Sequence, residues 1–221
     1  MNPNGLSTTN TVQLPEPTLR RLPWYLAFLT MLRAGNVEYV STTRIAEELD
    51  VDPSQIAKDL SFLGLKGKTR IGYRVDELEA KLRDFLGFGR RHNAVMVGAG
   101  SLGSALIADS GLQRYGLNIV AGIDTNPDRW GTTVNGVQIY APDALAQLVN
   151  DMNIGIGIIA VPFEFAQEVS DTLCRCGVRA IWNFTACRIR VPEGIVISNT
   201  SIYSNLALIY NRLSSVLPEP R

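Results

Sequence analysis

The sequence predicts an α/β protein in which a smaller α+β part precedes a larger domain built on a parallel sheet. Two short helical patterns around a tight turn, followed by a glycine-punctuated basic stretch, lie before residue 90. Beyond it, apolar strands alternate with helical patterns, which favours a parallel sheet with crossover helices. The motif G-x-G-x-x-G connects the first of these strands to a helix, and this context makes a short motif informative.

Size and composition fit a protein with packed hydrophobic cores. The chain has 221 residues, of which 46% are hydrophobic, and its 21 lysines and arginines balance 21 aspartates and glutamates. Whole-chain charge therefore does not indicate a nucleic-acid partner, and only local charge can do so. Apolar runs such as 154–161 are too short to cross a bilayer, and residues 1–22 lack the apolar region of a signal peptide. We expect a cytoplasmic protein with no membrane partner.

The three cysteines, Cys174, Cys176 and Cys187, are expected to be reduced thiols. Their number is odd, and neither a second cysteine pair nor histidines stand at the spacing of a zinc site. Cys174 and Cys176 are two residues apart, so on a helix they point in different directions. Packing is therefore favoured over a redox switch, and no metal site is expected.

The N-terminal part is predicted to begin with an arm and three helices. Residues 1–16 carry no apolar periodicity and are expected to be a flexible arm. Leucines at helical spacing predict a first helix over Thr18–Arg33. A second helix over Thr43–Leu49 and a third over Ser54–Leu63 flank a tight turn. This spacing is typical of a helix-turn-helix.

A basic hairpin follows the helix-turn-helix. The stretch Lys66–Val75 contains two glycines and predicts a β-hairpin, and a helix is expected over Asp76–Leu86. A helix-turn-helix followed by such a hairpin is a winged helix, predicted here over residues 17–88. Between residues 54 and 74, five basic residues against one acidic residue, Asp59, leave a net charge of +4. These five basic residues are Lys58, Lys66, Lys68, Arg70 and Arg74.

We expect this basic surface to bind double-stranded DNA, with the third helix in the major groove and the wing on phosphates or in an adjacent minor groove. A solvated wing without a partner is the plainer alternative. The candidate DNA-binding residues are Ser54, Gln55, Ala57, Lys58 and Ser61 on the helix and Lys66, Lys68, Arg70 and Arg74 on the wing.

The second domain is predicted over residues 89–200. After a linker at Phe88–Asn93, a buried strand is expected at Ala94–Val97 and a helix at Leu102–Asp109. Further strands are expected at Ile119–Asp124, Ile154–Val161 and Arg179–Trp182.

The glycine motif of this domain predicts a Rossmann-type dinucleotide site. Gly98 permits a tight turn, Gly100 lets the backbone approach a pyrophosphate, and Gly103 lets helix and strand pack closely. The helix N-terminus adds unpaired N–H groups and a partial positive charge. The residues expected to cradle the pyrophosphate are Gly98, Ala99, Gly100, Ser101, Leu102 and Gly103.

A carboxylate at the end of the next strand selects the dinucleotide. Asp124 is placed to accept from the adenosine ribose hydroxyls and would repel a 2′-phosphate, so NAD and NADH are favoured as cofactors over their phosphorylated forms. Other strand ends share the edge where ligands bind in parallel sheets. There, Val161 and Pro162 are expected to line the nicotinamide half, together with Asn183 and Phe184. Ordinary strand-end loops are the alternative for these four residues.

The chain lacks the residues that nicotinamide dehydrogenases use for proton transfer. Its one histidine, His92, lies in the predicted linker, Tyr140 belongs to no Y-x-x-x-K pair, and every lysine lies at or before Lys81. A bound dinucleotide without catalytic groups is better interpreted as a signal. A small NAD-dependent oxidoreductase with a helical appendage is the main alternative, and a CoA-binding or nucleotide-binding ligase subunit is a third.

The order of these parts resembles the Rex family of redox-sensing transcriptional repressors from about Pro17 to Leu213. The resemblance rests on the segments Arg21–Tyr25, Ile56–Phe62, Gly67–Lys68, Gly72–Tyr73, Val97–Gly103, Ala160–Pro162 and Trp182–Thr185. It implies a homodimer that binds operator DNA when free or NAD-bound and releases it when NADH binds. It also implies that the last helix, at residues 201–217, is exchanged between subunits.

An apolar stripe at the end of the chain fits this implied helix. Its residues at helical spacing, which require a partner surface, are Leu206, Ile209, Tyr210, Leu213 and Val216. Three features depart from the family pattern. Ala57 replaces an arginine before the Lys-Asp pair, Thr69 and Arg70 replace Arg-Gly in the wing, and Ser201 replaces an acidic residue.

Overall fold

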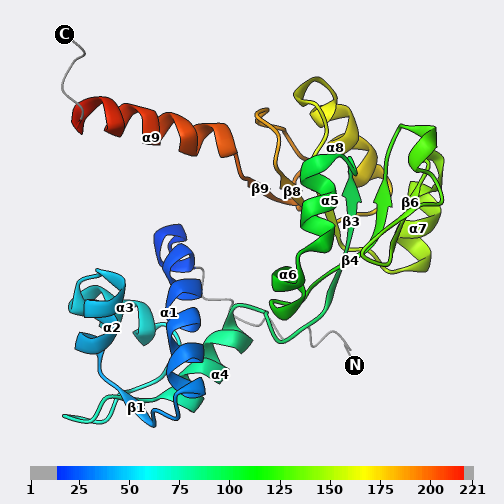
Figure 1. Cartoon of the computed structure of the whole chain (residues 1–221). Helices are drawn as coiled ribbons and strands as arrows, with labels where there is room; N and C mark the ends of the chain where they lie inside the picture. The colour runs from blue at the N-terminus through cyan, green and yellow to red at the C-terminus, as the bar shows by residue number, and fades with distance from the viewer. Residues whose placement is uncertain (1–13, 217–221) are drawn as a thin grey trace, which may run out of the picture. The chain divides into compact units, whose positions relative to one another are not determined.

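The computed structural model describes residues 14–216, with side chains described through Leu213, and the chain divides into two compact units between Gly89 and Arg90 (Figure 1). Of the expected N-terminal arm, residues 1–13 lie outside the described residues. Leu14, in contrast, is buried in the core of the first unit, and the first helix already begins at Glu16. The first helix therefore begins two residues before the predicted start at Thr18, and Leu14 belongs to the packed unit and not to the arm.

Within residues 14–89, four helices and a two-stranded sheet form the N-terminal unit. Its helices are α1 (Glu16–Ala34), α2 (Thr42–Leu49), α3 (Pro53–Ser61) and α4 (Val75–Phe85). Ser41 begins α2, because its hydroxyl accepts from the backbone N–H of Arg44 at 3.1 Å. Asp52 caps α3 in the same way, and Asp50 ends α2 in the left-handed conformation. The tight turn of the predicted helix-turn-helix thus contains both a stop and a start signal.

The wing differs from the predicted hairpin in its strand pairing. Within Lys66–Val75 only an isolated bridge joins Lys68 to Gly72, while β2 (Tyr73–Arg74) pairs antiparallel with β1 (Tyr39–Val40). The strand β1 was not predicted from the sequence. Gly72 makes the pairing possible, since its φ is +100° and a Cβ there would lie 2.2 Å from the carbonyl oxygen of Val40.

A seven-stranded sheet forms the C-terminal unit, in the order β5-β6-β4-β3-β7-β8-β9. All neighbouring pairs are parallel except β5 with β6. The strands are β3 (His92–Val97), β4 (Leu117–Ile123), β5 (Thr133–Val134), β6 (Val137–Tyr140), β7 (Ile156–Ile159), β8 (Ala180–Asn183) and β9 (Val196–Asn199). The helices are α5 (Ser101–Ala108), α6 (Ser110–Arg114), α7 (Leu145–Asp151), α8 (Ala166–Arg175) and α9 (Ile202–Val216).

Alternation along β3 divides the core of this unit into two layers. Val95 and Val97 belong to a cluster that contains residues of α7 and α8. Ala94 and Met96 point to the other face and belong to a cluster that contains Ile107 of α5. The sheet is therefore covered on both faces (Figure 1), as expected for a parallel sheet with crossover helices. The fold is the Rossmann-type arrangement that the glycine motif indicates.

The strand β3 begins two residues earlier than expected, at His92. The backbone N–H of His92 donates to the carbonyl oxygen of Gly116 at 2.8 Å, so this residue belongs to the sheet and not to the linker. The cysteines Cys174, Cys176 and Cys187 are free and half-buried. Burial raises the pKa of the Cys174 thiol, which disfavours the reactive thiolate.

The last helix, α9, exposes every residue from Ile202 to Leu213. The predicted apolar stripe lies on it at Leu206, Ile209, Tyr210 and Leu213, and the side chain of Val216 lies outside the described part. Ser201 caps this helix, because its hydroxyl accepts from the backbone N–H of Ser204 at 3.2 Å. Serine thus supplies the cap acceptor that an acidic residue would otherwise provide. Across residues 14–216, no helix has the length and hydropathy needed to span a bilayer.

Candidate functional site

The glycine loop between β3 and α5 has the geometry of a pyrophosphate cradle. Gly98 has φ +91°, and a Cβ there would lie 2.4 Å from the carbonyl oxygen of Ala160. A Cβ at Gly103 would lie 1.9 Å from the carbonyl oxygen of Gly98, so strand, loop and helix meet without room for a methyl group. Gly100 differs from both, since nothing lies within 4 Å of its Cβ position. The open space at Gly100, at the N-terminus of α5, fits the close approach of a phosphate.

The carboxylate of Asp124 lies beside this loop. Its Oδ2 accepts from the backbone N–H of Ala99 at 2.9 Å, and its Oδ1 accepts from the backbone N–H of Asn126 at 2.9 Å. Because each carboxylate oxygen has two acceptor sites, both can still accept from a ribose hydroxyl. The contact across 25 residues therefore fixes the spacing between the phosphate cradle and the candidate ribose site.

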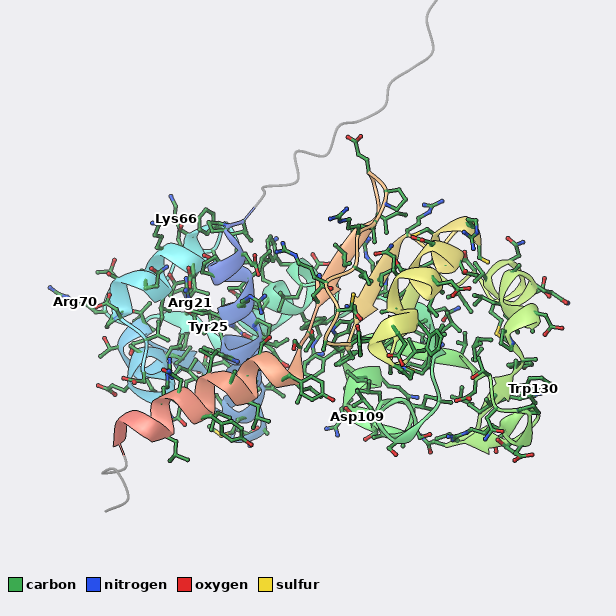
Figure 2. All side chains as sticks on the ribbon, turned by 90° about the horizontal axis from the view of Figure 1, so that it is seen from above. Arg21, Tyr25, Lys66, Arg70, Asp109 and Trp130 are labelled. Atoms are coloured by element: carbon green, nitrogen blue, oxygen red, sulfur yellow. The ribbon has the colours of Figure 1, made fainter. Side chains whose placement is uncertain are left out.

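Two residues not selected from the sequence, Arg129 and Trp130, fix the chain that follows Asp124. A short 3₁₀ turn at Pro127–Arg129 returns the chain toward α5, where Arg129 donates to the hydroxyl of Ser104 at 3.0 Å. Trp130, labelled in Figure 2, donates from its indole nitrogen to the carbonyl oxygen of Asp124 at 2.8 Å. The Asn126-Pro127 turn is the only signal of this return in the sequence.

A cavity of about 400 Å³ lies at the carboxyl ends of β7 and β8. Four residues expected to bind the cofactor line it: Leu102, Val161, Pro162 and Phe184. Six further residues complete the lining: Ala160, Phe163, Glu164, Thr185, Ala186 and Tyr203. Among these described lining residues Glu164 alone is charged, so the cavity has the apolar character expected for the nicotinamide half. Tyr203 comes from α9, which the strand-end argument could not include.

Asn183 shapes this cavity but does not line it. The side chain is fully buried, and its amide nitrogen donates to the carbonyl oxygen of Cys187 at 2.6 Å and to the Asn199 side chain at 2.9 Å. Its amide oxygen accepts from both the backbone N–H and the hydroxyl of Thr185. These four bonds occupy the amide. We therefore reassign Asn183 from a cofactor contact to a residue that holds the loop carrying Phe184.

The candidate nucleic-acid interface lies in the N-terminal unit. On α3 the exposed candidates are Ser54, Ala57, Lys58 and Ser61, whereas Gln55 is half-buried. On the wing, Lys66, Lys68 and Arg70 are exposed. Figure 2 shows Lys66 and Arg70 at the rim of this unit, with Arg70 extending away from the ribbon. Lys68 also lies over the ring of Tyr39, with its Nζ 5.6 Å from the ring centroid.

Arg74 does not belong to this free basic surface. Its guanidinium forms an ion pair with Asp76 at 2.6 Å and a second with Glu77 at 3.3 Å, both at the start of α4. The neighbouring carboxylates raise the pKa of Arg74. Because its charge is already compensated, we expect Arg74 to contribute less to phosphate binding than the three exposed wing residues.

Asp59, the one acidic residue counted within the basic stretch, is completely buried. Its carboxylate accepts two bonds from Arg21, at 2.7 and 2.9 Å, and one from Tyr25 at 2.8 Å. Thr18 and Gln55 donate at 3.0 and 2.8 Å. Burial alone would raise the pKa of Asp59, but these hydrogen bonds outweigh it and hold the pKa below its ordinary value. Asp59 is therefore a buried partner of Arg21 and does not belong to the exposed basic surface.

The two units together define a class of protein. A winged helix with a basic rim and a Rossmann-type domain with a phosphate cradle, joined in one chain, are the components of a nucleotide-responsive DNA-binding regulator. Sequence comparison agrees at the level of domains. Residues 13–61 match the family model of a DNA-binding protein N-terminus, and residues 90–187 match that of a CoA binding domain.

The chain belongs to the Rex family of redox-sensing transcriptional repressors. It is 49% identical to the redox-sensing transcriptional repressor Rex of Bacteroides fragilis over 211 residues, which cover 96% of each chain. It is 50% identical to Rex of Porphyromonas gingivalis over 204 residues, 92% of this chain and 94% of the relative. The resemblance proposed from the sequence is confirmed. The protein is accordingly a transcriptional repressor, and the oxidoreductase and ligase interpretations are set aside.

Solved structures of the family agree with the fold. The crystal structure of RSP in complex with beta-NAD+ and operator DNA has a TM-score of 0.88 at 31% identity, covering 91% of this chain and 93% of RSP. RSP in complex with beta-NADH has a TM-score of 0.83 at 30% identity, covering 92% and 95%. The predicted fold class, a winged helix followed by a Rossmann-type domain and a C-terminal helix, is confirmed.

Proposed function

We propose that this chain binds operator DNA through α3 and the wing, binds NADH or NAD between the glycine loop and the apolar cavity, and releases the operator when NADH binds. Residues 17–88 would bind DNA, residues 89–200 the dinucleotide, and residues 201–217 a second subunit. The observation that carries the proposal is the bond between Asp124 and Ala99 beside the open space at Gly100. This bond supports a ribose-binding role for Asp124 next to a phosphate-binding glycine loop, in a chain that also has a basic winged helix.

The response to redox state would depend on the nicotinamide ring. NADH can release DNA only if it binds the DNA-incompetent form more tightly than the competent form. The ring of NAD carries a positive charge and that of NADH does not, so desolvation in an apolar cavity favours NADH. The lining by Leu102, Val161 and Phe184 supports this preference.

The exposed stripe on α9 supports a homodimer. Three large apolar side chains on it, Ile209, Tyr210 and Leu213, are 58%, 59% and 49% exposed in the single chain. Covering these side chains with a second copy would remove that apolar surface from water. A twofold dimer carries two winged helices, and its operator would be roughly palindromic. We further propose that the protein acts in the cytoplasm, where both DNA and the NAD pool occur.

The first experiment is a fluorescence anisotropy titration of an operator from upstream DNA at fixed salt, with NADH and NAD added separately. We expect NADH alone to release the DNA, since only the reduced ring gains from the apolar cavity. NADPH is the control, because the Asp124 carboxylate should exclude its 2′-phosphate. Equal release by NADH and NAD, or dinucleotide binding without any DNA binding, would contradict the proposal.

Introducing a charge into the cavity should remove its redox preference. In Val161→Asp we expect the ratio of NAD to NADH dissociation constants to fall by at least about tenfold, because a carboxylate attracts the cationic ring and is costly to bury beside the neutral one. Isothermal titration calorimetry with each dinucleotide measures this ratio. Val161→Leu keeps the lining apolar and serves as the matched control. Unchanged NADH preference in the aspartate variant would show that the ring lies elsewhere.

A further inference from the structure

Gln55 lies on α3, the helix proposed to bind DNA, and one N–H of its side-chain amide donates to a buried residue of the protein. Its Nε2 donates to Oδ1 of the buried Asp59 at 2.8 Å. An ionised carboxylate only accepts hydrogen bonds, so the amide nitrogen has to face Asp59 and the amide oxygen has to face away from it. The low pKa of Asp59 keeps this carboxylate ionised at neutral pH. Rotation of the amide by half a turn is therefore disfavoured.

The carboxylate that orients Gln55 is itself immobilised by α1. Arg21 binds it through two nitrogens, and Tyr25 and Thr18 donate to it as well. Figure 2 shows Arg21 and Tyr25 together on α1. Five hydrogen bonds in total exceed the four acceptor sites that a carboxylate usually offers, so Asp59 has no freedom to turn. Because Asp59 is fixed by α1, the amide of Gln55 that bonds to it is restricted in orientation as well.

The free side of the Gln55 amide has one donor and one acceptor. Among residues 14–216, the amide has Asp59 as its hydrogen-bond partner, which leaves Oε1 and the second N–H of Nε2 for another molecule. Gln55 is the third residue of α3, whose cap is Asp52. The N-terminal residues of a recognition helix are the ones that reach base edges in the major groove. A donor beside an acceptor matches N7 and the N6 amino group of adenine, the pairing that glutamine makes in two-bond recognition.

We propose that Gln55 reads an adenine in each half-site of the operator, and that Asp59, anchored by Arg21 and Tyr25, is the positioning residue that presents the amide for this contact. The proposal rests on the proposed function, since it requires that α3 enters the major groove. It makes Gln55 a determinant of sequence specificity and separates it from Lys58 and the wing, whose charges serve affinity for any DNA.

The test removes single acceptor atoms from the DNA. An operator selected by the wild-type chain from a random palindromic library is synthesised with 7-deazaadenine at one adenine pair at a time. This base lacks the N7 acceptor and keeps Watson–Crick pairing. For wild type we expect one position at which binding weakens roughly tenfold or more, within the range of one good base contact. For Gln55→Met, which keeps the length of the side chain without the amide, the same substitution should have no further effect.

Matched controls separate this inference from folding and from the proposed function. Asp84→Asn changes an exposed residue of α4 that is not among the candidate DNA-binding residues, and it should keep the wild-type profile. Thermal unfolding checks the fold, and Gln55→Ala replaces the methionine variant if that protein does not fold. Identical profiles for wild type and the Gln55 variants would overturn the assignment to Gln55, although DNA binding itself would stand. Failure of wild type to select any sequence would overturn both proposals.

Discussion

Replacing Asp59 by asparagine is expected to lower the free energy of unfolding of the N-terminal unit by about 3–5 kcal/mol, the usual cost of removing one partner from a buried ion pair. The carboxylate is completely buried and accepts five hydrogen bonds, and the Arg21 side chain is only 20% exposed. An asparagine would present an NH₂ group to donors of Arg21 or Tyr25 and would leave the guanidinium uncompensated. Urea unfolding monitored by circular dichroism measures the difference.

The pH dependence provides a second readout for the same variant. The pKa of Asp59 is lower in the folded state than the ordinary value of about 3.9. Its contribution to stability is therefore fully present above that ordinary value and is lost as the pH falls through the folded-state pKa. We expect Asp59→Asn to lose less stability between about pH 5 and pH 2 than wild type does. The exposed Glu48, changed to glutamine, is the matched control. An unfolding midpoint at neutral pH equal to that of wild type would contradict the buried-pair account.

Alanine substitutions in the glycine loop should separate cofactor binding from folding. Gly100→Ala is expected to fold as wild type, because nothing lies within 4 Å of its Cβ position, and to bind NADH roughly 100-fold more weakly, because the methyl group fills the space meant for the pyrophosphate. Gly103→Ala is expected to destabilise the C-terminal unit by about 1–3 kcal/mol, since its Cβ would overlap the carbonyl oxygen of Gly98. Calorimetry with NADH and thermal unfolding measure the two effects.

Gly155→Ala is the matched control for this pair. Gly155 also has nothing within 4 Å of its Cβ position, but it lies before β7, at the opposite edge of the sheet from the glycine loop. It should change neither NADH affinity nor stability. Normal NADH binding by Gly100→Ala would place the pyrophosphate away from the loop and would contradict the proposed site.

The arrangement of the helices followed closely from local patterns. The third predicted helix, 54–63, compares with α3 at Pro53–Ser61, and the helix after the glycine motif, 102–109, compares with α5 at Ser101–Ala108. Helical periodicity and start signals such as Asp52 before α3 and Gly100 before α5 are encoded within a few neighbouring residues. The short strands β1, β5, β6 and β9 were not predicted. Unlike β7, which lies in the long apolar run 154–161, they contain only two to four residues without such a run and are therefore hard to tell from loops.

In the candidate sites, too, some residues could be selected from short sequence patterns, whereas others became apparent only from contacts between distant parts of the chain. The glycine loop, Asp124 and the basic residues of the wing could be selected as candidates from the sequence, because each depends on residue type at a fixed short spacing. Contacts between residues far apart in the chain decided the rest. Arg21 meets Asp59 across 38 residues, and Ser104 meets Arg129 across 25. The contact with Arg21 makes Asp59 a buried anchor of the core and not a surface charge, and the proposed role of Gln55 depends on it. Buried polar groups must find partners wherever the fold supplies them, so only the tertiary structure could assign these roles.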